Sequence, residues 1–368
     1  MLQATLYRWT PLFVATILVF MVTPIFWVTP LDVSAARLFF DPGNLENPWP
    51  QADAPLWAFF YQASWLLSLG IIVVSMLLVV AARLGKISPV WAPRGWAMLM
   101  VLILGGGILV NMGFKDNFGR YRPRQTDDFL GAQQYQMPLQ PGIAGTGKSF
   151  PSGHPVPAFA LSLLYFFWRR KNPRWAWIAL AASLSLGFLM GVGRMAAGAH
   201  YLSDIIWSGY FMFATAAVVY YAVLRVPEQE LRLEGGIKTP FTTSQKASLG
   251  AVIVIAVAIS AFTKPIGHES VYQLDATSLA GLSSIELRFD KAELQIDEVP
   301  DGQPLRVEVV SRSFGAPGAS VRREIEESSD QVLFNIYHEG HFTEKGTVIS
   351  VRLPASAVDK LQIKGRSD

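Results

Sequence analysis

Seven long apolar runs constrain the fold of this chain more than any other feature of its sequence. A helix that crosses a bilayer needs roughly 20 predominantly apolar residues, and runs of about that length recur here with Trp and Tyr near their edges. Only 16% of the residues are charged, against roughly 25% in ordinary soluble domains. The sequence therefore predicts an all-α polytopic membrane helix bundle. The expected spans are 11–28, 57–83, 96–114, 155–169, 175–193, 204–224 and 246–263.

Basic residues in the short loops predict how these spans are oriented. Lys and Arg concentrate in the cytoplasmic loops of membrane proteins, and here they gather in 83–94, 169–174 and 225–238. Those loops fall on one side of the predicted bundle, which we therefore expect to be cytoplasmic. The outer stretch 115–154 breaks this rule, because it contains Lys115, Arg120, Arg122, Arg124 and Lys148. Such a departure needs a local anion, and phosphate is the obvious one.

The last hundred residues change from long apolar runs to an alternation of apolar and polar residues. This pattern, seen in 285–289, 305–309 and 332–336, is typical of strands with one buried face. The sequence predicts a small C-terminal all-β extramembrane domain, either a sheet or a β-solenoid. The expected boundaries are 1–226 for the helical domain, 227–264 for a linker with the seventh transmembrane helix, and 265–368 for the β-domain.

Three polar clusters lie at helix ends that the predicted topology brings to the outer side. They are Lys115 to Pro123, Phe150 to Pro155, and Gly193-Arg194 with His200 and Asp204. His200 and Asp204 are spaced i,i+4, so on a helix their side chains share a face. A carboxylate that holds one imidazole nitrogen leaves the other free to attack an electrophile. By itself, such a pair is more often a surface His–Asp pair that caps a helix.

The other two clusters supply groups that bind a phosphate. The proline after His154 favours a helix start, where free N–H groups bind anions, and Gly153 permits close approach of the backbone. His154 can give a proton to a leaving oxygen. Three fixed cations, which would clamp the phosphate oxygens, are Lys115, Arg122 and Arg194.

Together the clusters resemble the type 2 phosphatidic acid phosphatase (PAP2) superfamily over about residues 60–225. Its pattern is Lys-x6-Arg-Pro, then Pro-Ser-Gly-His, then Ser-Arg-x5-His-x3-Asp, and Gly193 replaces the family serine here. The resemblance implies a six-helix PAP2 core plus one extra transmembrane helix, metal-independent hydrolysis and a phosphohistidine on His200. Asp204 would orient His200, and His154 would protonate the leaving group. The implied phosphate-binding residues are Lys115, Arg122, Ser152, Gly153 and Arg194.

The wording of two clusters, Asn-Phe-Gly-Arg-Tyr-Arg-Pro-Arg and Ser-Phe-Pro-Ser-Gly-His, resembles most the lipid A 1-phosphatase branch. Undecaprenyl diphosphate phosphatases form a related branch. We therefore expect hydrolysis of a lipid phosphate or diphosphate at the periplasmic face of a bacterial cytoplasmic (inner) membrane. A phosphotransferase that moves phosphate from undecaprenyl diphosphate to lipid A stays an alternative, as does a non-catalytic lipid-binding scaffold.

Other classes of site have weaker support in the sequence. The absence of cysteine removes disulfides, zinc-thiolate sites and thiol nucleophiles. Residues 142–149 match a nucleotide-binding P-loop pattern, but that pattern works only between a strand and a helix, and here it falls in an outer loop. We expect no cofactor, no metal, no nucleotide and no nucleic acid. The expected partner is the lipid phosphate itself, and the β-domain is available to a periplasmic partner.

Overall fold

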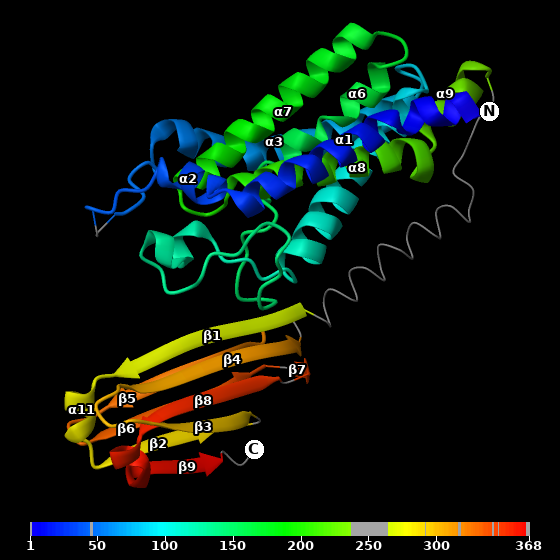
Figure 1. The fold of residues 1–368 in the computed structure, drawn as a ribbon. Helices are drawn as coiled ribbons and strands as arrows, with labels where there is room; N and C mark the ends of the chain where they lie inside the picture. Colours follow the sequence, from blue (N-terminus) through cyan, green and yellow to red (C-terminus); the bar gives the residue numbers. More distant parts are fainter. Residues whose placement is uncertain are drawn as a thin grey trace. The chain divides into compact units, whose positions relative to one another are not determined.

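The structure is a computed structural model of the 368-residue chain. It describes residues 2–44, 47–236, 264–290, 292–315, 318–340, 342–344 and 346–365. The described chain forms two compact units, one helical and one built of strands. Each is treated by itself below (Figure 1).

The helical unit contains five helices long and apolar enough to cross a membrane. Two of them change helix type along their length, because a π-helix continues the α-helix. The five are α1 (Leu2–Val28), α3 (Pro55–Arg83), α4 with η1 (Trp91–Met100 and Val101–Lys115), α7 (Pro173–Ala196), and α8 with η4 (Leu202–Val218 and Val219–Val223). This confirms the predicted polytopic helical membrane core.

The expected fourth span, 155–169, is a shorter apolar helix over Val156–Trp168. It consists of α5 (Val156–Ala160) and α6 (Leu163–Trp168), which are separated by a turn. The seventh predicted span, 246–263, lies outside the residues that the structure describes. Short elements complete this unit: α2 (Leu31–Arg37), η2 (Pro123–Gln125), η3 (Asp127–Phe129) and α9 (Val226–Glu234).

Glycines allow the helices of this unit to approach closely. A Cβ on Gly187 would lie 2.3 Å from Phe159, and one on Gly191 would lie 2.5 Å from Ile205. A Cβ on Gly106 would likewise lie 2.6 Å from Val156. Small residues at such positions let membrane helices pack backbone to backbone. The close packing of η1, α5, α7 and α8 therefore fixes the helix ends that carry the three polar clusters.

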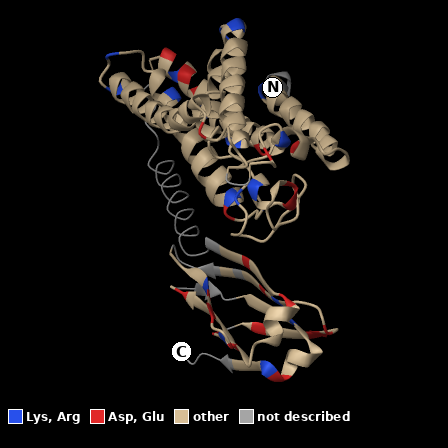
Figure 2. Cartoon of the chain, turned by 90° about the vertical axis from the view of Figure 1, so that its left-hand side faces the viewer, with Lys and Arg blue, Asp and Glu red and all other residues tan. Residues whose placement is uncertain are grey.

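The basic helix ends gather around α9. Arg94 pairs with Glu230 at 2.7 Å, and Lys171 pairs with Glu234 at 2.8 Å. Arg8, near the start of α1, pairs with a third acidic residue of α9. These ion pairs attach α9, which follows the predicted domain boundary at residue 226, to the other helices of this unit. Figure 2 shows charged residues at the ends and loops of this unit, while the long helices are mostly tan.

The β unit consists of two sheets that share one core. The first has the order β1-β4-β8-β3, with β7 paired to β4, and the second has the order β5-β6-β2-β9. The strands are β1 (Lys264–Leu274), β2 (Ser284–Phe289), β3 (Glu293–Val299), β4 (Leu305–Gly315), β5 (Ser320–Glu327), β6 (Gln331–Glu339), β7 (Phe342–Glu344), β8 (Thr347–Pro354) and β9 (Leu361–Gly365), with the short helices α11 (Ala276–Ala280) and η5 (Ala355–Lys360).

Alternating residues of these strands point into the core, as the period-two pattern predicts. Leu287, Val309 and Phe334 are all buried there. The all-β C-terminal domain is thus confirmed. Antiparallel pairings such as β1–β4 and β5–β6 occur beside parallel pairings such as β2–β6. The strands therefore form sheets of mixed direction rather than a solenoid of parallel coils.

Candidate active site

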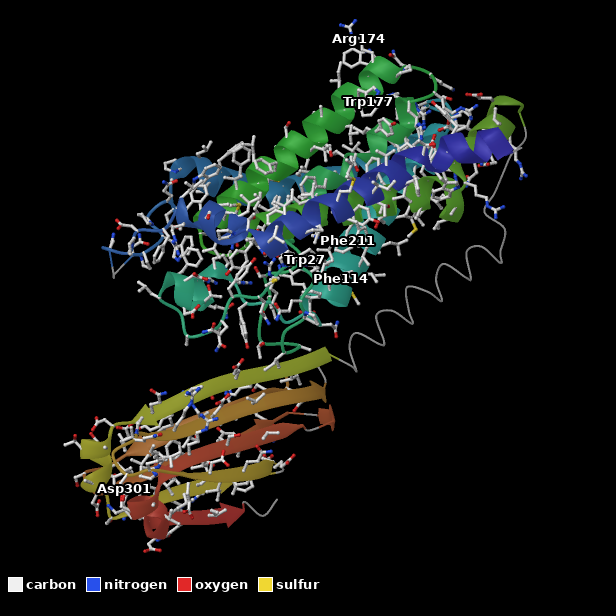
Figure 3. The ribbon with its side chains drawn as sticks, in the orientation of Figure 1. Trp27, Phe114, Arg174, Trp177, Phe211 and Asp301 are labelled. Atoms are coloured by element: carbon white, nitrogen blue, oxygen red, sulfur yellow. The ribbon has the colours of Figure 1, made fainter. Side chains whose placement is uncertain are left out.

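The structure brings the three polar clusters together at one end of the helical unit. Lys115 is the last residue of η1, Arg194 lies in the last turn of α7, and His200 follows it before α8 begins. In Figure 3, Phe114 and Phe211 mark this region, whereas Arg174 and Trp177 lie at the far end of α7. The helix directions therefore separate the cluster end from the end where α9 pairs with basic residues.

An aromatic cluster supports the loop that carries Ser152 and His154. Phe150, fully buried, lies 4.5 Å from the Phe118 ring and 6.2 Å from the Phe211 ring, measured between centroids. Phe114 of η1 stacks on Phe211 of α8 at 4.6 Å. Buried aromatic contacts of this kind combine large apolar area with defined geometry. The loop is thereby held against both η1 and α8.

His200 is held by a partner that the sequence did not indicate. Its Nδ1 lies 2.6 Å from the backbone carbonyl oxygen of Ser149 and 3.8 Å from Asp204 Oδ2. The direct hydrogen bond is therefore from Nδ1–H to the Ser149 carbonyl, and Asp204 acts on the ring at longer range. This arrangement leaves Nε2 as the nitrogen able to attack an electrophile.

The predicted shared helix face of His200 and Asp204 is wrong. His200 precedes α8, and Asp204 is the third residue of that helix. Asp204 Oδ2 accepts the N–H of Tyr201 at 2.8 Å and the hydroxyl of Ser149 at 2.6 Å. Asp204 comes close to His200 because its side chain turns back toward the start of the helix, where free N–H groups need acceptors.

Arg120 is fully buried and lies between two carboxylates. One terminal nitrogen is 2.5 Å from Asp204, and the other is 2.8 Å from Asp32 of α2. Burial lowers the pKa of Arg120, but the two carboxylates more than offset this and hold the pKa above its usual value. Asp32 also accepts the N–H of Ser203 at 2.8 Å. The sequence predicts that Arg120, like the other cations of 115–154, pairs with a phosphate, but in the structure protein carboxylates already neutralise it.

The other cations near the three clusters fall into two groups, those that pair with a protein carboxylate and those that do not. Lys148 pairs with Asp116 at 3.0 Å. Lys115, Arg122 and Arg194, by contrast, form no ion pair within the described part of the chain. Burial, and then the charge of its neighbour Arg124, lowers the pKa of Arg122. Partly buried cations without a counter-charge are costly unless an anion joins them.

Two buried polar atoms in this region also lack a protein partner among the described residues. They are the hydroxyl oxygen of Ser152 and Nε of Arg194. Such atoms are rare in folded proteins and often indicate a ligand. We call Lys115, Arg122, Ser152, Gly153 and Arg194 the phosphate site. A tetrahedral anion there would receive the charge of three cations and bond both unpartnered atoms.

The sequence predicts a free N–H at Ser152 and a helix start after His154 as anion-binding groups, and the structure provides neither in the expected form. The N–H of Ser152 donates to the carbonyl of Asp204 at 3.2 Å, so it is not available to an anion. The helix α5 that follows has only five residues, too few for a substantial helix dipole. Gly153 fits its predicted role, because a Cβ there would lie 3.0 Å from the Lys115 ammonium. A Cβ on Gly193 would face Trp57 of α3 at 3.3 Å.

Both histidines of the site have a lowered pKa. Burial, and then the positive charge of Arg194 and its neighbours, lowers the pKa of His154 to about 3. Burial lowers the pKa of His200 to about 4, despite the opposing effect of Asp204. Both rings are therefore neutral near pH 7 in the free protein. A bound phosphate would offset the cations and raise the pKa of His154, which also stacks on the Tyr61 ring at 4.7 Å.

The segment 142–149, with its P-loop pattern, is irregular and is followed by α5 only at Val156. It therefore lacks the strand–loop–helix context of a nucleotide site. Within the described residues, no group of three or more His, Cys, Asp or Glu side chains is placed to hold a metal ion.

Comparisons with known proteins confirm the family resemblance. Residues 95–227 match the sequence model of the PAP2 superfamily. The lipid A 4'-phosphatase of Francisella tularensis subsp. novicida is 31% identical over 34% of this chain and 57% of its own length. The lipid A 4'-phosphatase of Rhizobium leguminosarum is 35% identical over 36% of this chain and 54% of its own length. The chain thus spans about half the length of these relatives.

A PAP2-type phosphatidylglycerolphosphate phosphatase from Bacillus subtilis is a more distant match among solved structures. It has 16% identity and a TM-score of 0.30, over 61% of this chain and 98% of that chain.

Replacing Asp32 by asparagine tests the buried Arg120 network. Breaking a buried ion pair typically costs about 3–5 kcal/mol, since a charge is left without a partner. We expect Asp32→Asn to lower the thermal unfolding temperature of the detergent-solubilised protein and to reduce its turnover. The control is Asp53→Asn, which changes an exposed carboxylate in the stretch between α2 and α3. Equal unfolding temperatures for the two variants would contradict a structural role for Asp32.

The lowered pKa of His200 predicts a loss of stability in acid. A free histidine titrates near 6.5, so the unfolded chain binds more protons than the folded protein between that pH and about pH 4. Stability is complete above pH 6.5 and falls as the pH decreases, by about 2–3 kcal/mol at pH 4.5. Unfolding curves at pH 7 and 4.5 should show a smaller pH dependence for His200→Gln. An unchanged dependence would show that His200 titrates normally.

Proposed function

We propose that this chain, whose residues 95–227 form a PAP2 superfamily domain, is a membrane lipid phosphatase that works through a phosphohistidine. The main support is the phosphate site beside His200. Among the described residues, its three cations have no protein counter-charge, and two of its buried polar atoms have no hydrogen-bond partner. A bound phosphoryl group would supply the missing counter-charge and the missing hydrogen-bond partners. A non-catalytic lipid-binding scaffold would not need an attacking imidazole beside that anion site.

The reaction proceeds in two balanced steps. When the substrate binds, its phosphate raises the pKa of His154, which takes up a proton from solvent or from the phosphate monoanion. Nε2 of His200 attacks phosphorus, the bond from phosphorus to the leaving oxygen breaks, and the protonated His154 gives that oxygen its proton. The phosphoryl group is then held on His200 by the phosphate site. In the second step water attacks phosphorus, His154 takes a proton from the water, and the P–N bond breaks to release phosphate. The Ser149 carbonyl keeps Nδ1 protonated throughout, and Asp204 stabilises the positive imidazole.

Preorganised cations account for much of the rate. Negative charge on the three equatorial oxygens persists through phosphoryl transfer, so catalysis depends chiefly on positioning and electrostatic stabilisation. Lys115, Arg122 and Arg194 are already partly desolvated in the free protein, so little reorganisation is needed when the substrate binds. Removing one such donor typically costs about 100- to 1,000-fold in kcat.

The proposed substrate is a lipid A phosphate, with undecaprenyl diphosphate second. The wording of the motifs favours the 1-phosphate, whereas the two relatives described above are named lipid A 4'-phosphatase. The assay below therefore has to decide which phosphate of the lipid A sugar is removed.

We further propose that the protein resides in a bacterial inner membrane with the site on the periplasmic side. The basic helix ends around α9 lie at the other end of the bundle, as the positive-inside rule requires.

His200→Gln tests the nucleophile. Purified protein in detergent is given lipid A labelled at either phosphate, or labelled undecaprenyl diphosphate, each alone and then both together. We expect free phosphate from the wild type and a loss of at least 1,000-fold in the variant. His268→Ala, a histidine of β1, is the control and should keep full activity. Normal phosphate release by His200→Gln would refute the mechanism, and label passing between lipids without free phosphate would make the protein a phosphotransferase.

The role of His154 as the acid predicts a dependence on the leaving group. A sugar or lipid alkoxide needs a proton as it leaves, whereas p-nitrophenolate does not. We expect His154→Ala to lower the single-turnover release of the leaving alcohol from a lipid phosphate about 100- to 10,000-fold, and the single-turnover release of p-nitrophenolate much less. Single turnovers are compared because the second step, which also uses His154, is common to both substrates. An equal loss with both substrates would mean that His154 binds the phosphate rather than protonating the leaving oxygen.

A further inference from the structure

One face of the helix α3, near its start, contacts the candidate active site. Trp57, Tyr61 and Ser64 are spaced four and then three residues apart, so their side chains share this face. Trp57 lies against Gly193 of α7, where an added Cβ would be 3.3 Å from the Trp57 ring. Ser64 donates its hydroxyl to the backbone carbonyl of His154 at 2.7 Å. The neighbours of Tyr61 on α3 therefore fix this face against two of the three clusters.

The ring of Tyr61 contacts two groups of the site. Its centroid is 4.7 Å from the centroid of the His154 ring, and the two ring planes are inclined by 32°. The guanidinium carbon of Arg194 lies over the same tyrosine ring, 5.1 Å from its centroid. One aromatic ring of α3 therefore touches both the proposed acid and a cation of the phosphate site.

The charges around His154 disfavour the positive form that it needs as an acid. Burial, and then the charges of four basic side chains, lower its pKa; these side chains are Arg194, His200, Lys115 and Arg122. The helix α3 adds no charge at this point, because its only charged residue is Arg83 at its other end. The face of an aromatic ring attracts cations within about 6 Å of its centroid. Both Arg194 and a protonated His154 lie within that distance of Tyr61.

Aromatic residues are common at membrane interfaces whether or not they contact a site, and α3 has an example. Phe59 is exposed, and its ring contacts that of Phe60 alone among the rings of the described residues. Tyr61 differs, because its ring meets residues from the loop before α5 and from the last turn of α7. Its hydroxyl forms no hydrogen bond with a described residue. The contacts of Tyr61 with the site therefore depend on its ring.

We propose that Tyr61 is a positioning residue for the reaction, whose ring orients the His154 imidazole and the Arg194 guanidinium and stabilises His154 in its protonated form. This rests on the proposed phosphatase function and deepens it. Tyr61 lies outside residues 95–227, which match the PAP2 superfamily. The helix α3 therefore contributes to the reaction through two residues of the matched segment.

Removing the ring tests this role in the purified full-length protein. Tyr61→Leu should lower the single-turnover release of the leaving alcohol from lipid A about tenfold, a part of the loss expected without the acid. Release of p-nitrophenolate needs no proton and should fall less. Tyr61→Phe keeps the ring and should stay within about twofold of the wild type. The matched control, Phe59→Leu, removes an exposed ring of the same helix and should change neither rate.

The pH profile separates positioning from a loss of folded protein, because the pH at which a rate falls does not depend on the amount of active protein. The first step requires protonated His154, so alcohol release falls as the pH rises through the pKa of His154 in the complex. Without the ring the protonated form is less stable. In Tyr61→Leu the fall should therefore begin about half a pH unit lower, whereas Tyr61→Phe and Phe59→Leu should keep the wild-type profile.

Three outcomes would overturn the role of the ring while leaving the phosphatase function in place. They are an unmoved pH profile in Tyr61→Leu, an equal loss of alcohol and p-nitrophenolate release in that variant, and a Tyr61→Phe variant as slow as Tyr61→Leu. A wild type that releases no alcohol from the lipid and no p-nitrophenolate would overturn the proposed function itself.

Discussion

The buried guanidinium of Arg120 is the interaction on which the rest of the site depends. A full positive charge without contact with water is tolerated only where carboxylates surround it, and here Asp204 and Asp32 lie on either side. Asp204 in turn receives the hydroxyl of Ser149, whose carbonyl holds Nδ1 of His200. One ion-pair network thus joins α2, the loop after η1 and the start of α8. The position of the His200 ring depends on this network through Asp204 and Ser149.

Two kinds of cation account for the unusual charge of the outer loop. Arg120 and Lys148 are matched by carboxylates of the protein, and they hold the fold together. Lys115 and Arg122 have no such match among the described residues and face the same region as the unpartnered Ser152 hydroxyl. This end of the helical unit therefore carries positive charge that no described carboxylate neutralises and that a bound anion would neutralise. At the other end, acidic residues of α9 pair with Arg8, Arg94 and Lys171.

The residues of the candidate site come from two parts of the chain, the segment after residue 95 and the helix α3. The groups that would handle the phosphoryl oxygens come from the segment that matches the PAP2 superfamily. Tyr61 of α3 stacks on His154 and lies under Arg194. This tyrosine thus contacts two residues of the proposed site from outside the segment that matches the PAP2 superfamily.

Local properties of the sequence determined the transmembrane spans, the strands and the three clusters, because run length, period and motif spacing are read within a few tens of residues. The three clusters and the C-terminal β-domain are therefore predictable from the sequence alone. Only the tertiary structure determined that His200 bonds the Ser149 carbonyl and that Arg120 pairs with Asp32. It also determined that α9 attaches to the other helices and that polar residues of α3 lie beside His154. These depend on contacts across long stretches of chain, such as the 171 residues between Asp32 and Ser203. No local pattern specifies which buried charge meets which, because that choice is made when the helices pack.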